Sequence, residues 1–285
     1  MADMPIPVTQ LVLDRYYVDE KGTQIDPDKQ KLNASITEPL KQFVGGISKF
    51  ADSDDSDTAL EWMVAWAKAG AYLGKIDGKQ AEYQRKWDLC GICLAYYKVK
   101  DKATPAQKII IEDWLNTYAT RVINFFDPSK HKKNNQYYWV GLAALSAYIV
   151  LDKPRYFDKA VNIFLDSLNA INDDGSLPLE LDRDDRALHY HCFACMPLMM
   201  MAAIREKLEP KSVSWWAPKI TALAELSING LNSPEKFMDI DQESDVEPGA
   251  GWYQLYRNKY PDSPETEVEI KDNHRWLGGK VDNWF

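Results

Sequence analysis

The stretch QRKWDLCGICLAYYKV, at residues 84–99, decides the expected fold class. Its apolar residues recur every three or four positions, the spacing that places side chains on one face of a helix: Trp87, Cys90, Leu94 and Tyr97. Similar stripes begin at Leu60, Leu115 and Trp216, and each is long enough for a helix of several turns. The sequence therefore predicts a chain made mostly of helices.

Short breakers rich in Gly, Pro, Asp and Lys separate the stripes, at residues 74–79, 100–105 and 172–178. Convincing runs of alternating strand residues are absent from the sequence. We therefore expect a single-domain, nearly all-α protein over residues 1–285, built from successive helical hairpins. No exact repeat is visible, so periodicity alone does not establish that the hairpins curl into a toroid.

The chain is acidic overall, with 43 Asp and Glu against 34 Lys and Arg and a net charge of -9. This balance argues against general nucleic-acid binding, which relies on a basic surface. An acidic protein can still hold an anion where its cations gather. In this sequence they gather at residues 130–133, Arg85, Lys86, Arg183 and Arg186.

The sequence shows neither a membrane segment nor a secretory leader. No apolar run approaches the roughly 20 residues that a membrane-spanning helix needs. The start, MADMPIPVTQ, lacks the basic segment followed by an apolar one that marks a signal peptide. We therefore expect either a cytosolic protein or a mature secreted form that begins with an added methionine.

Four cysteines form two CxxC pairs, at residues 90–93 and 192–195, a spacing that suggests zinc or redox chemistry. Both pairs lie within apolar sequence of helical spacing. This favours small residues of the core over the two alternatives, a disulfide or a zinc site. The acidic runs at residues 52–57 and 239–247 lack the glycine and the glutamate that an EF-hand loop needs, so they are interpreted as solvated loops. No metal site is predicted.

The segment KHKKNNQYYW, at residues 130–139, has two interpretations. It can be a polar loop that caps a helix beginning near Trp139. It can also be an anion and sugar subsite, because amides and cations bind carboxylates and hydroxyls while aromatic rings stack on pyranose faces.

A second polar segment, RDDRALHYHCFACMPLMMM, covers residues 183–201. Its histidines, His189 and His191, are two positions apart and point in different directions on a helix, so they form a poor metal pair. Arg186 is the better anion contact because its planar guanidinium matches a carboxylate.

Together these segments resemble the alginate lyases of the mannuronate-specific kind, bacterial periplasmic enzymes with an (α/α) toroid. The resemblance runs from IDPDK at residues 25–29 to YRNKYPDS at 256–263 and RWLGG at 275–279. Its most specific motifs are NN-x-x-YW, here residues 134–139, and LPLE…RALHYH, here residues 177–191. The resemblance implies a single all-α toroid or incomplete barrel of helical hairpins.

The resemblance also implies a reaction, the β-elimination of a uronic acid polymer. A proton leaves C5, the glycosidic oxygen leaves C4, and a 4,5-unsaturated sugar forms. An amide and an arginine neutralise the carboxylate and so stabilise the negative charge that develops beside it. By the motif these neutralisers are Asn135 and Arg186, and both are present.

The two proton carriers of the family are replaced in this chain. The resemblance places a histidine at position 136 and a tyrosine at position 193, where this sequence has Gln136 and Phe193. Neither side chain exchanges a proton near neutral pH. A binding protein descended from a lyase would show this pattern, and so would a lyase inactivated in the laboratory.

The remaining site residues are expected to bind substrate along the groove. They are Arg85, Lys86, Tyr137, Tyr138, Trp139, Tyr190, His191 and Arg275. The carboxylate clamp requires no cofactor. The expected partner is an acidic polysaccharide of the alginate or polyuronate class, with exopolysaccharide synthesis or export proteins as further partners, and the resemblance implies the periplasm.

Three functions stay open on the sequence. The first is a silent or weakened lyase that binds acidic polysaccharide, favoured because both neutralisers are kept while both proton carriers are lost. The second is an active polysaccharide lyase of mannuronan, alginate or a related polyuronate that uses a relocated base, for which Tyr137 has the strongest claim. The third is a scaffold whose cleft binds a protein.

Overall fold

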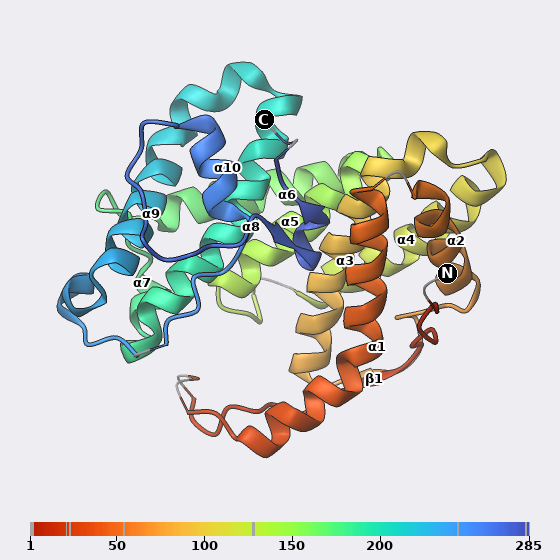
Figure 1. Cartoon of the computed structure of the whole chain (residues 1–285), viewed down its shortest axis with the longest axis horizontal. Helices are drawn as coiled ribbons and strands as arrows, with labels where there is room; N and C mark the ends of the chain where they lie inside the picture. The colour runs from red at the N-terminus through yellow and green to blue at the C-terminus, as the bar shows by residue number, and fades with distance from the viewer. Residues whose placement is uncertain are drawn as a thin grey trace.

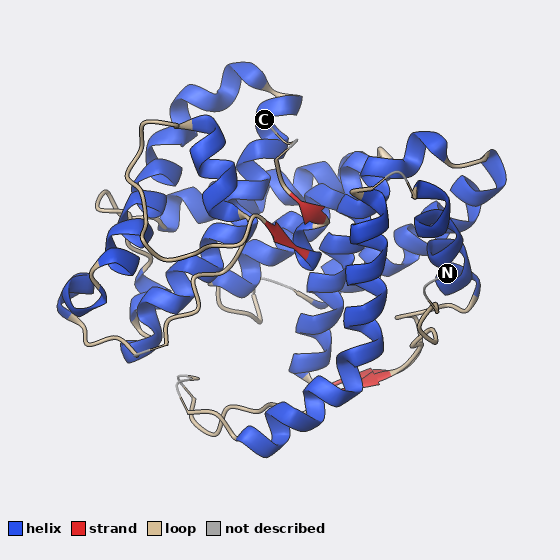
Figure 2. Cartoon of the chain, viewed as in Figure 1, coloured by secondary structure: helices blue, strands red, loops and turns tan. Residues whose placement is uncertain are grey.

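The structure, a computed structural model, describes residues 3–20, 22, 24–53, 55–126, 129–243, 245–282 and 284, without the side chains of residues 212–215. Its α-helices are α1 (Pro27–Ala51), α2 (Ser56–Lys68), α3 (Lys79–Val99), α4 (Pro105–Phe125), α5 (Asn135–Leu151), α6 (Pro154–Ala170), α7 (Pro178–Leu181), α8 (Ala187–Leu208), α9 (Val213–Asn232) and α10 (Trp252–Lys259). Helices dominate the chain in Figure 2, which confirms the predicted all-α class.

Short elements complete the chain. The 3-10 helices are η1 (Lys100–Lys102), η2 (Asp184–Arg186), η3 (Pro210–Ser212), η4 (Pro234–Asp239) and η5 (Arg275–Leu277). Strand β1 (Leu11–Val12) pairs in parallel with β2 (Ile76–Asp77), and β3 (Asn273–His274) pairs antiparallel with β4 (Gly279–Lys280). Each pair is only two residues long, so helix packing determines the fold.

The helices form two layers, as expected for a toroid of helical hairpins. In the inner layer α1 packs on α3, α3 on α5, and α5 on α8. In the outer layer α2 packs on α4, while α4 and α6 cover α5 and α9 covers α8. Figure 1 shows α3, α5 and α8 running through the middle of the molecule with the other helices around them.

Of the inner helices, α3, α5 and α8 are buried on nearly all sides. In α3 the predicted stripe is correct at Trp87, Cys90 and Leu94, which are buried, but Tyr97 is 40% exposed. Its neighbour Tyr96 is fully buried instead, because α3 contacts other helices on several sides. A helix without a solvent face has no single apolar stripe that the sequence could reveal.

Helix α8 also belongs to the core. The segment Asp184–Leu208 is long and apolar enough by composition to cross a membrane, which the search for apolar runs did not anticipate. Within the structure 94% of its most apolar window is buried, as in the core helix of a soluble protein. All four cysteines, on α3 and α8, are buried free thiols, which confirms their interpretation as core residues.

A buried carboxylate joins three distant parts of the chain. Asp88 on α3 accepts hydrogen bonds from the Tyr72 hydroxyl at 3.0 Å, from Gln84 Nε2 at 2.9 Å and from the indole N–H of Trp276 at 3.1 Å. Burial raises the pKa of Asp88 to about 6. The network fixes Trp276, and with it the C-terminal segment, against α3.

The C-terminal segment approaches α3 at Gly91. A Cβ atom at this position would lie 2.2 Å from the backbone oxygen of Arg275 and 2.8 Å from a methyl group of Val44. We therefore expect Gly91→Ala to lower the free energy of unfolding by about 1–3 kcal/mol, because the backbone cannot yield without separating η5 from α3. Urea unfolding measures the change.

The matched control is Gly45→Ala on α1, where nothing lies within 4 Å of the added Cβ. This substitution should raise the free energy of unfolding by about 0.4–1 kcal/mol, because it removes backbone freedom from the unfolded chain. Equal urea midpoints for the two variants would contradict the close packing of η5 on α3.

Candidate functional site

Helix α5 begins at Asn135, four residues before the expected start near Trp139. The side chain of Asn134 caps it, since its Oδ1 accepts a hydrogen bond from the Gln136 N–H at 3.1 Å. Asn135 and Gln136 therefore lie in the first helical turn. The N–H groups of this turn already have acceptors in Glu180 and Asn134.

Glu180, on α7, holds Asn135 in place. Its carboxylate accepts the Asn135 backbone N–H at 2.6 Å and the Nδ2 amide at 2.7 Å. Both residues are fully buried, and the Oδ1 atom of Asn135 has no hydrogen-bond partner among the described residues. Burial raises the pKa of Glu180 to about 7, although the two hydrogen bonds from Asn135 oppose the shift.

Arg186, in η2, is held at the start of α8 by two neighbours. Its Nε donates to Glu243 at 3.2 Å, and Nη1 donates to the Tyr17 hydroxyl at 3.0 Å. The Tyr17 hydroxyl also lies 2.9 Å from that of Tyr190, whose ring is 5.3 Å from the guanidinium. Residues before α1 thus reach across to α8 and cover Arg186, a contact that the sequence did not indicate.

Gln136 is held by Lys86 of α3. The Lys86 Nζ donates to the side-chain Oε1 of Gln136 at 2.6 Å and to its backbone oxygen at 3.0 Å. Lys86 is fully buried, with its Nζ 4.6 Å from the ring centre of Phe126 and 4.7 Å from that of Tyr83. Burial lowers its pKa well below the usual range of a lysine.

Phe193 lies one helical turn after His189 on α8, within a group of aromatic rings. Its ring centre is 5.5 Å from that of Trp139, 5.9 Å from Trp87 and 6.4 Å from His189, with which it is parallel. Trp276 stacks on Trp87 at 4.5 Å. Phe193 itself is only partly buried, so this aromatic group reaches the surface.

The two histidines of α8 face different neighbours, as predicted. The Nε2 of His191 accepts the Leu177 N–H at 2.9 Å, and its Nδ1 lies 2.7 Å from the Ala187 oxygen. Burial lowers the pKa of His191 to about 4. For His189, burial and then the charges of Arg186 and Arg183 lower the pKa to about 3. Both imidazoles are therefore neutral at pH 7.

Several predicted binding residues lie away from solvent or from the other site residues. Tyr138 and Trp139 are at most 1% exposed, so neither presents a free ring face to a sugar. The Tyr137 hydroxyl donates to Asp166 of α6 at 3.0 Å, and burial raises its pKa above the usual range. Tyr137, the strongest candidate for a relocated base, is thus paired with a helix of the outer layer.

Two predicted cations also have partners inside the protein. Arg85 is buried and forms an ion pair with Glu82 at 2.5 Å on α3. The Arg275 guanidinium lies 4.6 Å from the ring centre of Trp276, and burial lowers its pKa. Of the predicted site residues, the structure brings Gln136 together with Lys86, Arg186 with Tyr190, and Phe193 with Trp139.

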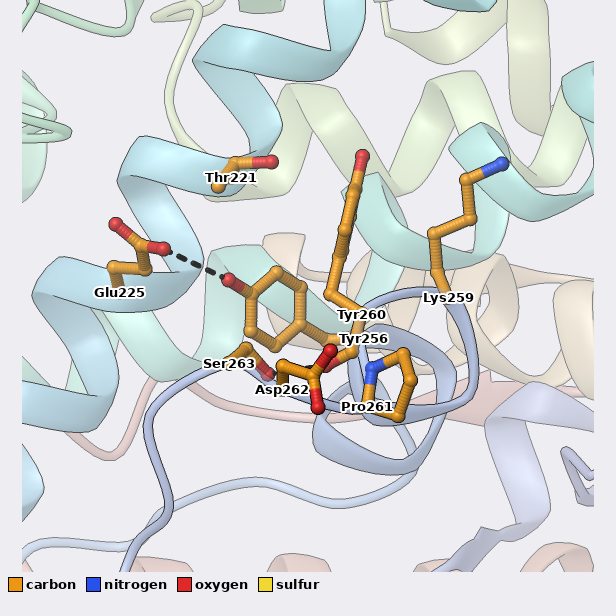
Figure 3. A pocket seen from close by; sticks show the side chains of 8 residues that line it. All are labelled: Thr221, Glu225, Tyr256, Lys259, Tyr260, Pro261, Asp262 and Ser263. Carbon is orange, nitrogen blue, oxygen red and sulfur yellow. Dashed lines mark hydrogen bonds between the residues drawn. The ribbon is translucent and has the colours of Figure 1, made fainter.

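One hollow on the surface lies apart from these residues. Figure 3 shows it between α9 and α10, with a volume of about 400 Å³. It is lined by Thr221, Glu225, Tyr256, Lys259, Tyr260, Pro261, Asp262 and Ser263, none of them a predicted site residue. Within the described part of the chain, no group of three or more His, Cys, Asp or Glu side chains is placed to hold a metal ion.

Sequence comparisons match this chain to alginate lyases and to a polysaccharide lyase. The alginate lyase family model matches residues 11–237. A polysaccharide lyase of Stenotrophomonas maltophilia is 35% identical over 261 residues, which cover 87% of this chain and 78% of the relative. An alginate lyase of Azotobacter vinelandii is 30% identical over an alignment of 314 residues, covering 99% of this chain and 83% of the relative.

Solved structures share the fold. Alginate lyase A1-III from Sphingomonas species A1 superposes with a TM-score of 0.81 at 19% identity, over 98% of this chain and 84% of that one. A variant of alginate lyase A1-III in complex with a tetrasaccharide gives a TM-score of 0.83 at 20% identity, over 97% and 83% of the two chains. These matches confirm the helical toroid.

The raised pKa of Glu180 predicts how its replacement changes with pH. The folded protein keeps the Glu180 proton between the usual pKa of 4.5 and about 7, so its stability falls as pH rises through this range. Glu180→Gln removes the titration. Relative to the variant, the parent chain should lose up to about 3 kcal/mol between pH 4 and pH 8. Urea unfolding at both pH values measures this, and parallel pH profiles would contradict it.

Proposed function

The chain belongs to the alginate lyase family, and on that premise we propose that it binds an acidic, uronate-containing polysaccharide and has lost most or all lyase activity. One observation carries the proposal. The positions that the family resemblance assigns to its two proton carriers hold Gln136 and Phe193, while the two assigned carboxylate neutralisers, Asn135 and Arg186, are kept. The sequence therefore retains the residue types that bind a carboxylate without those that move a proton, although the Asn135 amide is buried and donates to Glu180 in this structure.

Carboxylate recognition is supported by the charges around Arg186. Its guanidinium is half of an ion pair with Glu243, whose side chain is 28% exposed. A sugar carboxylate can replace Glu243 as the acceptor for Arg186, since a planar guanidinium binds a carboxylate through two parallel hydrogen bonds. Arg183, whose guanidinium lies 3.6 Å from the ring centre of Tyr190, adds a second positive charge.

The loss of activity follows from the chemistry at C5. A glutamine amide and a phenyl ring neither accept the C5 proton nor donate one to the leaving oxygen. The nearby ionisable groups are poorly suited to replace them, and Glu180 and Lys86, which lie next to Asn135 and Gln136, are fully buried. His189 is a weak base with a pKa of about 3, Tyr137 donates to Asp166, and burial raises the pKa of Tyr190 above the usual range of a tyrosine.

The proposal includes the ligand and the setting. We propose mannuronan as the first ligand to examine, because the motifs resemble those of mannuronate-specific lyases, and polyglucuronate as the second. A solved relative of the same fold is described in complex with a tetrasaccharide. The proposed setting is the periplasm, in the synthesis or export of an acidic exopolysaccharide.

Ultraviolet absorbance of the 4,5-unsaturated product tests the proposal. The chain is incubated with polymannuronate, alginate and polyglucuronate beside a Gln136→His/Phe193→Tyr double variant, and oligosaccharide binding is measured by calorimetry. We expect the unmodified chain to bind without forming product. Restoring the carriers should raise the rate at least about 10²-fold, because each proton transfer contributes about 10²–10⁴.

Two outcomes would contradict the proposal. Product formation by the unmodified chain at the rate of the double variant would show that another residue is the base. Absence of binding to every acidic glycan would favour a protein-binding scaffold instead. The single variants Gln136→His and Phe193→Tyr serve as controls, since each restores only one proton carrier.

A further inference from the structure

A buried lysine without a carboxylate partner lies directly behind the position of the lost histidine. Lys86 is fully buried, and no ion pair joins it to an acidic residue in the described part of the chain. Removing an ammonium from water is costly unless other groups replace its hydration. Here the two oxygens of Gln136 and the aromatic rings of Tyr83 and Phe126 take that place.

The contact with Lys86 fixes the orientation of the Gln136 carboxamide. A lysine ammonium has hydrogens to donate and no lone pair, so the atom 2.6 Å from its Nζ is the carbonyl oxygen Oε1. The NH2 group of Gln136 consequently points away from Lys86. This Nε2 atom makes no hydrogen bond within the described residues and is not among the buried polar atoms without partners, so it faces solvent.

The free NH2 group lies at the reaction centre of the proposed site. Gln136 is in the first turn of α5, directly after Asn135, which the proposed function assigns to the carboxylate. Trp139, one turn further along α5, packs on Phe193 of α8. The role proposed below therefore requires the amide to face the Phe193 side of α5.

We propose that Lys86 is a positioning residue that holds the Gln136 carboxamide with its NH2 group toward the sugar, where it donates to the uronate carboxylate. The inference rests on the proposed function, and it gives Gln136 a role beyond the loss of a base. The positive charge of Lys86 polarises the amide and strengthens its N–H groups as donors. A proton carrier has been replaced by a fixed donor.

The proposal predicts a pH dependence of binding. The ionisable groups that face Lys86 are Glu82, Tyr83 and Cys90 of α3, while α5 offers only the uncharged Gln136 and the segment after α4 only the Phe126 ring. Burial lowers the lysine pKa, so the ammonium loses its proton below the usual range. Affinity for the uronate should then fall as pH rises, because the neutral amine polarises the amide less.

Calorimetric titration with a mannuronate tetrasaccharide between pH 6 and pH 9 tests the role of Lys86. Lys86→Met should weaken binding about 10-fold at pH 6 and remove the alkaline loss of affinity. Gln136→Leu should have the same two effects. In the Lys86→Met/Gln136→Leu double variant the losses should not add, because both changes remove one interaction. A purely structural lysine would give no such coupling.

Two further variants separate a loss of binding from a loss of folding. Gln136→Glu retains a partner for Lys86 and hence the fold, but it turns a carboxylate toward the sugar and should weaken binding more than 100-fold. Lys68→Met, which removes an exposed lysine at the end of α2, is the matched control and should leave the affinity unchanged. Thermal unfolding of each variant confirms that it is folded.

The possible results separate the two proposals. If the unmodified chain binds no tetrasaccharide of mannuronate or glucuronate, both the proposed function and the role of Lys86 are overturned. If it binds while Lys86→Met keeps the same affinity and pH profile, only the role of Lys86 is overturned. If Lys86→Met does not fold, the pH profile of Gln136→Leu decides, because an alkaline loss that persists without the amide excludes the proposal.

Discussion

Burial of the inner helices is the constraint on which the site depends. Helices α3, α5 and α8 have almost no solvent face, yet they carry ionisable and amide side chains that need partners inside the protein. Asp88 finds three donors, from Tyr72, Gln84 and Trp276. Because Tyr72 and Trp276 come from other parts of the chain, the Asp88 carboxylate also fixes two segments against α3.

The candidate site is built from the same kind of contact. Glu180 fixes the first turn of α5 through the backbone and side chain of Asn135, and Lys86 fixes it from the α3 side through Gln136. Two buried groups with pKa values shifted by burial thus hold one helix end. Shifted pKa values are common at functional sites, because binding and catalysis often require charged groups to be buried. Here Glu180 and Lys86 both contact the first turn of α5.

The sequence predicted the fold class and which residues stand next to one another in the site motifs. It did not predict which side chains from distant parts of the chain contact them. Helical spacing and breakers were sufficient for the all-α hairpins, and the NN-x-x-YW motif placed Asn135 beside Gln136. The early start of α5 was readable, since Asn134 is a favourable cap residue. The contacts of Gln136 with Lys86 and of Asn135 with Glu180 span 50 and 45 residues, and no local pattern encodes partners at that distance.

The proposed replacement of a histidine by Gln136 fits the neighbourhood of Lys86. A carbonyl oxygen is an acceptor at every pH, whereas an imidazole would lose its acceptor whenever it took up a proton. In the proposed complex, a fixed amide contacts the bound carboxylate before and during any reaction. Interactions that are equal in both states strengthen binding without lowering the barrier between them. Donors that are fixed in place, without a proton carrier, therefore favour retention of a uronate chain over its cleavage.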